Sequence, residues 1–293
     1  MSAARMRAIV LARGRCRQLT VNSSINLASR PARPLPGRFV STFPNAAASL
    51  PSPPSLLRRV AFRAGIALVF IPLGFVMAAA TAKPAIDGIL NPPSDEETLT
   101  MFVPEHDEEH EVEAFINDHP LTREMRDKEG FSESRPHLKI PPVFRNNTLT
   151  GGTLMGPGRV VVPPLTFAEK GGKSLVSISY LGNELCGHPG IIHGGFLATM
   201  LDEGLARCCF AALPHKVGLT ANLNINYRAP APAGCYVVLK AKTTRVEGRK
   251  AWVEGRIETL VAEGETPLVL AEATALFVSP KHASMMMNFY PTT

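Results

Sequence analysis

The residue types best suited to chemistry gather in one short stretch, residues 187–210, which reads GHPGIIHGGFLATMLDEGLARCCF. It contains two histidines, His188 and His193, then a glycine pair, and then an apolar run that carries Asp202 near its middle. If this run is helical, the wheel gives Asp202 only small neighbours, since 3.6 residues make one turn. These neighbours are Gly195, Ala198, Ala206 and Cys209. A ligand or a second chain can approach a carboxylate closely on such a face, so Asp202 is a candidate general base.

A second acidic residue, Glu203, directly follows Asp202 but occupies a different face of the predicted helix. It forms a polar stripe with Thr199 and Arg207, and its spacing from Arg207 suits an ion pair one helical turn apart. We therefore interpret Glu203 as a structural residue and Asp202 as the chemical one.

The glycine pair Gly194–Gly195 opens the predicted helix. Backbone N–H groups in the first turn of a helix lack intrahelical acceptors, and glycine lets a substrate oxygen come close to them. The positive end of the helix dipole adds to this, so the pair predicts an oxyanion site. Gly194 and Asp202 are roughly 12 Å apart along the helix, too far to act on one carbonyl. The sequence thus favours a site that combines the glycines of one chain with the aspartate of a second, related by a two-fold axis.

The elements around this helix predict an α+β fold. Alternating and β-branched segments separated by Gly- or Pro-containing turns predict strands within residues 159–168, 174–182, 217–230, 235–248, 250–264 and 267–280. Short turns favour antiparallel pairing. The helix, predicted from Gly194 to Leu213 and ended by Pro214, is the only long element available to cover one face of such a sheet.

One predicted strand also carries candidate site residues. Strand alternation places Thr220 on one face together with Asn222, Asn224, Asn226 and Arg228, opposite an apolar face that ends with Tyr227.

The motif HGGFLATMLDEG, the following GLTANLNINYRAPAPAG and the order of strands resemble the hotdog-fold thioesterases, in particular phenylacetyl-CoA and medium- to long-chain acyl-CoA hydrolases. The run from INDHPL through SRPHLKIP is similar to fungal mitochondrial members of that superfamily, and the likeness covers roughly residues 112–280. The resemblance implies a hotdog fold, with an antiparallel sheet wrapped around one long central helix. It also implies acyl-CoA hydrolysis by a homodimer or a dimer of dimers, without a cofactor or a metal.

Carried onto this sequence, the resemblance implies a role for each motif residue. Asp202 would be the base or nucleophile, the Gly194 and Gly195 amides would polarise the thioester carbonyl, His193 would shape the oxyanion loop, and Thr220 would position water. Asn222 and His188 are the expected substrate-binding residues.

The sequence departs from the family pattern at one position. Many relatives carry Asn or Gln six residues before the histidine, where this chain has Gly187 with His188 beside it. Either His188 takes over the polar contact, or the site is slower or different. This departure keeps open a membrane-tethered acyl-CoA or lipid-binding module without turnover. A hotdog hydratase or dehydratase is the second alternative, against which the helix aspartate and the doubled glycine argue.

The N-terminal part has a different composition. All eleven charged residues before Lys83 are arginines, so the basic character belongs to this part and does not indicate a nucleic-acid partner. Acid-free, Arg- and Ser-containing residues 1–40 predict a mitochondrial transit peptide, and residues 41–63 a Pro/Ser-rich linker. The uncharged residues 64–82 are long enough to cross a bilayer.

The remaining segments complete the predicted organisation. A linker is expected at 83–104, short helices at 105–135, the hotdog domain at 136–280 and a tail at 281–293. Arginines before the apolar segment and acids after it favour an inner-membrane protein whose C-terminal domain lies in the intermembrane space.

Overall fold

The structure is a computed structural model that describes residues 55–286 of the 293-residue chain. The predicted transit peptide at 1–40 and most of the tail expected at 281–293 lie outside the described residues.

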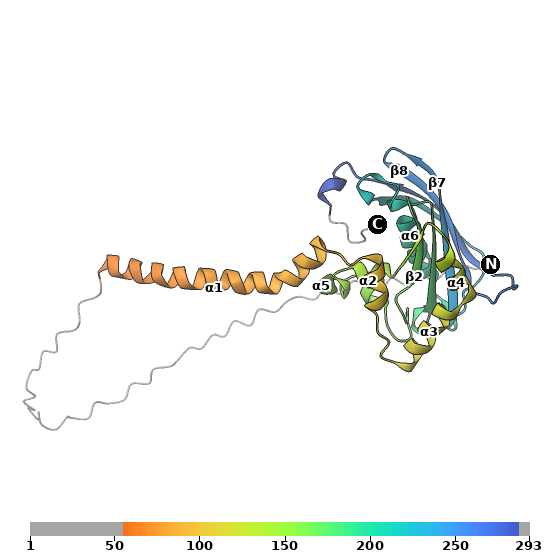
Figure 1. Ribbon diagram of the computed structural model, residues 1–293, viewed down its shortest axis with the longest axis horizontal. Coiled ribbons are helices and arrows are strands. Elements are labelled where there is room, and N and C mark those ends of the chain that lie inside the picture. Colours follow the sequence, from red (N-terminus) through yellow and green to blue (C-terminus); the bar gives the residue numbers. More distant parts are fainter. Residues whose placement is uncertain (1–54, 287–293) are drawn as a thin grey trace, which may run out of the picture. The chain divides into compact units, whose positions relative to one another are not determined.

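A seven-stranded sheet in the order β1-β2-β3-β7-β8-β9-β6 forms the frame of the folded domain (Figure 1). Every neighbouring pair in it is antiparallel. The predicted pairing across short turns is confirmed for β7 with β8 and for β8 with β9. It is wrong for β6 and β7, because β6 pairs with β9 at the sheet edge although only residues 228–234 separate it from β7. The strands are β1 (Phe131–Ser134), β2 (Leu165–Glu169), β3 (Ser174–Leu181), β6 (Leu219–Tyr227), β7 (Cys235–Glu247), β8 (Lys250–Thr259) and β9 (Val269–Val278). A separate two-stranded hairpin joins β4 (Cys186–His188) to β5 (Ile191–Ile192), directly before the central helix.

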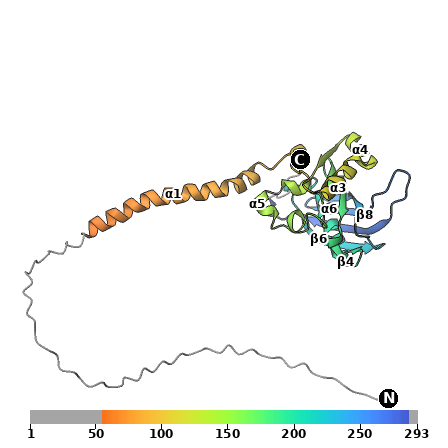
Figure 2. The ribbon, with the colours of Figure 1, turned by 90° about the horizontal axis from the view of Figure 1, so that it is seen from below.

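The central helix α6 (Gly194–Phe210) packs against one face of this sheet (Figure 2). Its buried side chains are apolar, among them Leu197, Leu201 and Leu205. Gly204 allows the closest approach, because a Cβ atom there would lie only 2.5 Å from a methyl carbon of Leu239 on β7. The expected α+β hotdog architecture, an antiparallel sheet wrapped around one long helix, is confirmed. The helix was expected to end at Leu213 but ends at Phe210. The backbone N–H groups of Ala212 and Leu213 bond to carbonyls three residues earlier, so the chain already turns there, before Pro214.

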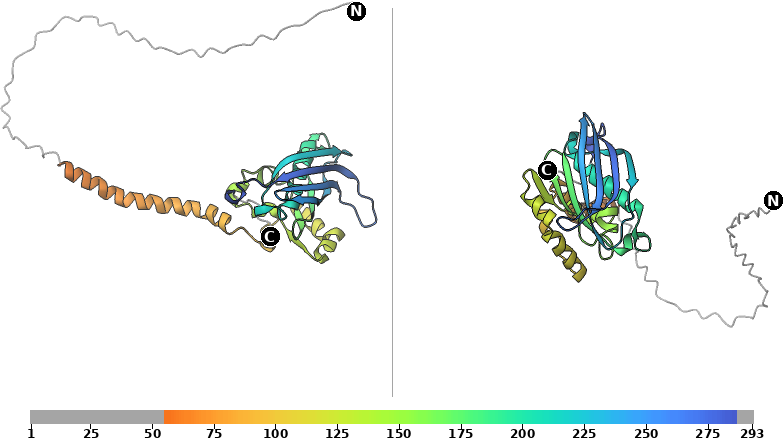
Figure 3. Two further views of the ribbon diagram at one scale, coloured as in Figure 1. Left: turned by 90° about the horizontal axis from the view of Figure 1, so that it is seen from above. Right: turned by 90° about the vertical axis from the view of Figure 1, so that its right-hand side faces the viewer.

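The opposite face of the sheet is covered near β2, β3 and β7 by α3 (Asp107–Asp118) and α4 (Pro120–Asp127), shown in Figure 3. Val112, Ile116 and Met125 of these helices are buried against Phe167, Ile178 and further apolar residues of the sheet. The domain therefore has two apolar cores, one on each side of the sheet.

Before these helices lie α1 (Leu56–Leu90) and α2 (Asp95–Thr100). Among the described residues, one helical segment is long and apolar enough to cross a membrane; it spans Leu56–Lys83 and contains the predicted segment 64–82. The end of α1 and all of α2 fall in the range expected as a linker, and Ser94 begins α2 with a reciprocal capping box to Glu97.

Short helical turns connect the remaining elements. They are η1 (Pro136–Lys139), α5 (Pro142–Arg145), η2 (Leu149–Thr153), η3 (Asn183–Leu185), η4 (Pro214–Lys216) and η5 (Ala283–Met285). Residues 136–153, which precede β2, bring polar side chains to the helix α6, as described below.

Candidate active site

Asp202 on α6 and Thr220 on β6 are in direct contact. The Thr220 hydroxyl donates a hydrogen bond of 2.8 Å to Oδ1 of Asp202, in a solvent-exposed position. The hydroxyl fixes the carboxylate's orientation and leaves its second oxygen available for another partner. Two predicted site residues from separate elements are thus brought together.

A β-bulge explains how Thr220 reaches the helix. Thr220 pairs with Phe277 and Asn222 with Leu276, so Ala221 is the extra residue on β6. Directly paired residues point to the same face, and neighbouring residues of β9 point to opposite faces. Thr220 therefore shares the helix-facing side with Phe277, whereas Asn222 shares the opposite side with Leu276. The predicted common face of Thr220 and Asn222 is wrong, because regular alternation does not survive a bulge.

His193 begins α6 as its N-cap. Its Nδ1 accepts a hydrogen bond of 2.9 Å from the backbone N–H of Gly195. The Gly195 amide is thereby engaged, while the N–H of Gly194, the first helical residue, has no intrahelical acceptor. The two glycines are therefore not equivalent donors.

Tyr227, at the end of β6, holds the start of α6 in place. Its hydroxyl donates a hydrogen bond of 2.8 Å to the carbonyl oxygen of Gly194. A Cβ atom at Gly194 would lie 3.4 Å from the tyrosine ring, so the ring packs on the glycine itself. The sequence pattern assigned Tyr227 only to the apolar face and gave no signal for this contact.

The unusual Gly187 lies directly against His193. A Cβ atom at Gly187 would be 2.9 Å from Cδ2 of the His193 ring and 3.1 Å from its Cα. An Asn or Gln at this position would displace the capping histidine. The adjoining surface groove of about 480 Å³ is lined by Gly187, His188, His193 and Gly194, with Tyr227 at its side.

The predicted residues thus form two groups at different places on α6. The group at the start of the helix consists of His188, His193, Gly194 and Gly195. The second group, farther along the helix, is the pair of Asp202 and Thr220. Asp202 and Gly194 are separated by about two helical turns, roughly 12 Å.

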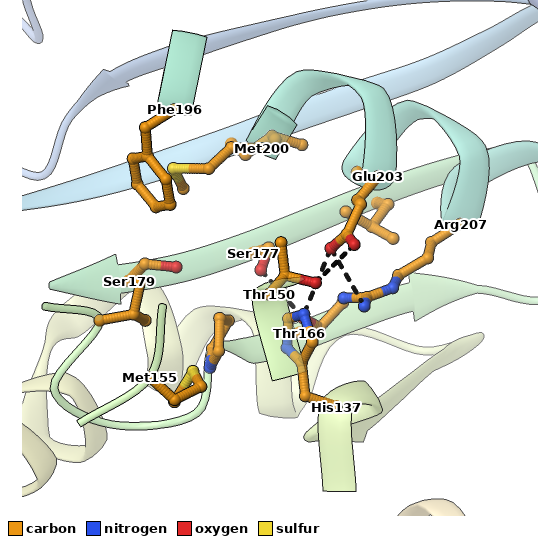
Figure 4. A pocket seen from close by; sticks show the side chains of 15 residues that line it. His137, Thr150, Met155, Thr166, Ser177, Ser179, Phe196, Met200, Glu203 and Arg207 are labelled. Atoms are coloured by element: carbon orange, nitrogen blue, oxygen red, sulfur yellow. Dashed lines mark hydrogen bonds and ion pairs between the residues drawn. The ribbon is translucent and has the colours of Figure 1, made fainter. Parts of the chain in front are cut away.

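Glu203, interpreted above as structural, lies in a polar cluster that the sequence did not reveal (Figure 4). Its carboxylate accepts a hydrogen bond of 2.6 Å from the Thr150 hydroxyl and lies 3.2 Å from Nε2 of His137. The expected pair with Arg207 is present at 3.4 Å. Both His137 and Thr150 come from the segment before β2.

The cluster has a defined ionisation state at neutral pH. Burial would raise the pKa of Glu203, but the hydrogen bond from His137 and the charge of Arg207 outweigh it and lower the pKa to about 2. Burial, together with the charge of Arg207, lowers the pKa of His137 to about 4. Glu203 is therefore ionised and His137 neutral, with the Nε2–H donating to the carboxylate.

Comparison with known proteins gives matches over the same part of the chain. The family model described as Thioesterase superfamily matches residues 189–261. An uncharacterized mitochondrial protein of Candida albicans is 36% identical over 176 residues, which cover 57% of this chain and 78% of that protein. The mouse acyl-coenzyme A thioesterase THEM4 is 38% identical over 112 residues, covering 38% of this chain and 46% of its own.

Among solved structures, a phenylacetic acid degradation-related protein of Ralstonia eutropha is similar to this chain. It shares 28% sequence identity with a TM-score of 0.31, covering 37% of this chain and 76% of its own.

Proposed function

This chain belongs to the thioesterase superfamily, and from that premise we propose that it hydrolyses the thioester of an acyl-CoA to a free acid and CoA. The observation that carries the proposal is the contact between Thr220 and Asp202. It holds the half-buried carboxylate of Asp202 in fixed orientation beside an exposed threonine, where a substrate can reach it.

In this proposal Asp202 acts on the thioester carbonyl carbon, either as the base that deprotonates a water or as the nucleophile itself. As base, it takes a proton while the water oxygen bonds to the carbon. The carbon–sulfur bond then breaks, and the proton passes to the leaving thiolate to give CoA. Thr220 orients the carboxylate throughout.

The start of α6 supplies the electrophilic part of the site. The N–H of Gly194 faces no helical acceptor and lies at the positive end of the helix dipole, which suits a developing oxyanion. His193 keeps the Gly195 amide bonded and fixes the helix start. This capping role also disfavours a hydratase, in which the histidine would act on a substrate hydroxyl.

We infer that two copies of the chain share each site. The distance between Gly194 and Asp202 within one helix is too long for one carbonyl, so the aspartate must come from a second helix. The β6 strand is an edge of the sheet and most of its residues are exposed. A two-fold dimer would place two α6 helices together and create two equivalent sites.

We place this activity at a mitochondrial membrane, anchored through α1. The apolar Leu56–Lys83 segment supports the anchor, and the Candida albicans relative is described as mitochondrial. With arginines before the segment, the domain would lie in the intermembrane space. Protease treatment of mitoplasts should then degrade the domain, and a protected domain would reverse the orientation.

The direct test is CoA release from a panel of acyl-CoAs by the full chain in detergent. Asp202→Asn should slow release by about a hundredfold or more, whereas Asp118→Asn, at an exposed position, should leave it unchanged. Acyl-CoA binding without release by the wild type would contradict the hydrolase and favour a binding module. Unchanged release by Asp202→Asn would remove that residue from the mechanism.

A further inference from the structure

A small cavity lies between α6 and the sheet, on a different side of the helix from Asp202 (Figure 4). Its volume is about 50 Å³, which has room for on the order of four water-sized atoms. Phe196, Met200 and Glu203 line it from the helix, so it begins one residue after Gly195 and extends along α6.

Most of the lining is apolar, but β3 contributes two serines to it. Every second residue of β3 points toward α6, and along that face these residues are Leu175, Ser177, Ser179 and Leu181. Ser177 shares a hydrogen bond of 2.9 Å with Thr166. Ser179 is only 1% exposed, and its hydroxyl has no hydrogen-bond partner among the described residues.

An unpartnered buried hydroxyl in a core position costs stability, because it has lost its hydrogen bonds to water and gained none in the protein. Figure 4 shows the Ser179 oxygen directed toward the interior of the cavity, at the end occupied by Phe196 and Met155. The position is therefore suited to a partner that enters the cavity and forms a hydrogen bond there.

The far end of the cavity carries a second unpartnered atom. His137 is 5% exposed, and its Nδ1 has no hydrogen-bond partner among the described residues. Because its other nitrogen donates to Glu203, Nδ1 is an acceptor. One end of the cavity thus offers the Ser179 hydroxyl, and the other end offers Nδ1 of the neutral His137 as an acceptor.

The charges around the cavity favour an uncharged occupant. Glu203 is already bonded to Thr150 and His137 and paired with Arg207. A carboxylate at the end of an acyl chain would lose its hydration among apolar side chains and would lie near the charge of Glu203. A neutral hydroxyl, which can both donate and accept, matches the available atoms better.

We propose that this cavity receives the acyl part of the substrate and selects short, uncharged chains that carry a hydroxyl group, with Ser179 as the residue that recognises the hydroxyl. The proposal rests on the thioesterase function proposed above and adds the substrate class. Phe196, Met155 and Met200 would contact the carbon chain, while the flexible methionines adjust to its shape.

The test compares three thioesters with the full chain in detergent: butanoyl-CoA, 3-hydroxybutanoyl-CoA and 4-hydroxybutanoyl-CoA. At least one hydroxylated substrate should have a kcat/KM about tenfold higher than butanoyl-CoA, the range expected for one added hydrogen bond. Ser179→Ala should abolish this preference, lowering kcat/KM for the hydroxylated thioester to that of butanoyl-CoA. Because the removed hydroxyl has no partner, the variant should fold at least as stably as the wild type.

Ser177→Ala is the matched control, since it removes a hydroxyl from the same face of β3 that is already bonded to Thr166. It should keep the preference. Equal kcat/KM values for all three substrates, or a preference that survives Ser179→Ala, would overturn the proposal while leaving the hydrolase function intact.

If none of the three is hydrolysed, the hydrolase function fails for this substrate range, and calorimetry with the same thioesters still tests the cavity. Tighter binding of a hydroxylated thioester that Ser179→Ala weakens would support the cavity assignment. Equal binding of the three thioesters would overturn it.

Discussion

The pair formed by His137 and Glu203 makes the stability of the domain depend on pH in a defined window. In the folded protein, burial lowers the pKa of His137 from 6.5 to about 4. Between these two values the unfolded chain binds a proton that the folded chain does not. Stability therefore falls as the pH is lowered from about 6.5 toward 4, and it recovers as the pH is raised. The pKa of Glu203 is lowered from 4.5 to about 2, so this residue changes the stability only below about pH 4.5.

The size of this effect follows from the two pKa values of His137. At 1.36 kcal/mol for each pKa unit, the domain should lose about 2.5 kcal/mol of unfolding free energy between pH 7 and pH 4.5 through this residue. The substitution His137→Gln removes the titration and retains an N–H donor for Glu203. The pH-dependent loss should then shrink by about that amount.

Urea unfolding of the full chain in detergent, followed by the fluorescence of Trp252, measures this directly. Trp252 is the only tryptophan of the sequence and lies on β8 within the domain. Burial also lowers the pKa of His119. This residue is present in both proteins, so its contribution to the pH dependence cancels in the comparison. The exposed control His282→Gln should keep the full loss. Identical pH dependence of wild type and His137→Gln would refute the reasoning.

Two further substitutions test the geometry of the site. Thr220→Val removes the hydroxyl that orients Asp202 and should lower kcat about fivefold to tenfold, whereas Thr220→Ser should retain activity; equal kcat values for both variants would contradict the positioning role. Gly187→Asn should displace His193 and release the Gly195 amide, lowering the unfolding free energy by about 1 kcal/mol, as for a lost helix cap. Ala262→Asn, at an exposed position outside the helices and strands, is the control, and equal stability of the two variants would count against the close contact.

Much of the fold could be predicted because its signals are local. The apolar period of residues 194–210 identifies the central helix, and alternation with Gly- and Pro-containing turns identifies the main strands. The four-residue β1 (Phe131–Ser134) was missed, because its polar sequence becomes a strand only by pairing with β2.

The position of a candidate residue could be predicted where it follows from that residue's own helix or strand, and the roles stay predictions. The small neighbours of Asp202 distinguish it from Glu203 on a helical wheel, and the glycine pair marks the helix start. The bulge at Ala221 depends on how β6 pairs with β9, so the face of Thr220 could not be obtained from alternation. The pairing of Glu203 with Arg207 follows from helical spacing, but His137 and Thr150 lie 66 and 53 residues from Glu203 in sequence, which no local pattern can reveal.

The most direct measurement of the central claim, a site shared between two chains, is complementation between two inactive variants. Gly194→Pro removes the N–H of the first helical residue, a position where proline is well tolerated, and Asp202→Asn removes the acid. Subunits of the two variants are dissociated, mixed in equal amounts and reassembled. Half of the resulting dimers should be mixed, each with one intact site, so CoA release should recover to about one quarter of the wild-type rate. No recovery above the separate variants would contradict the shared site.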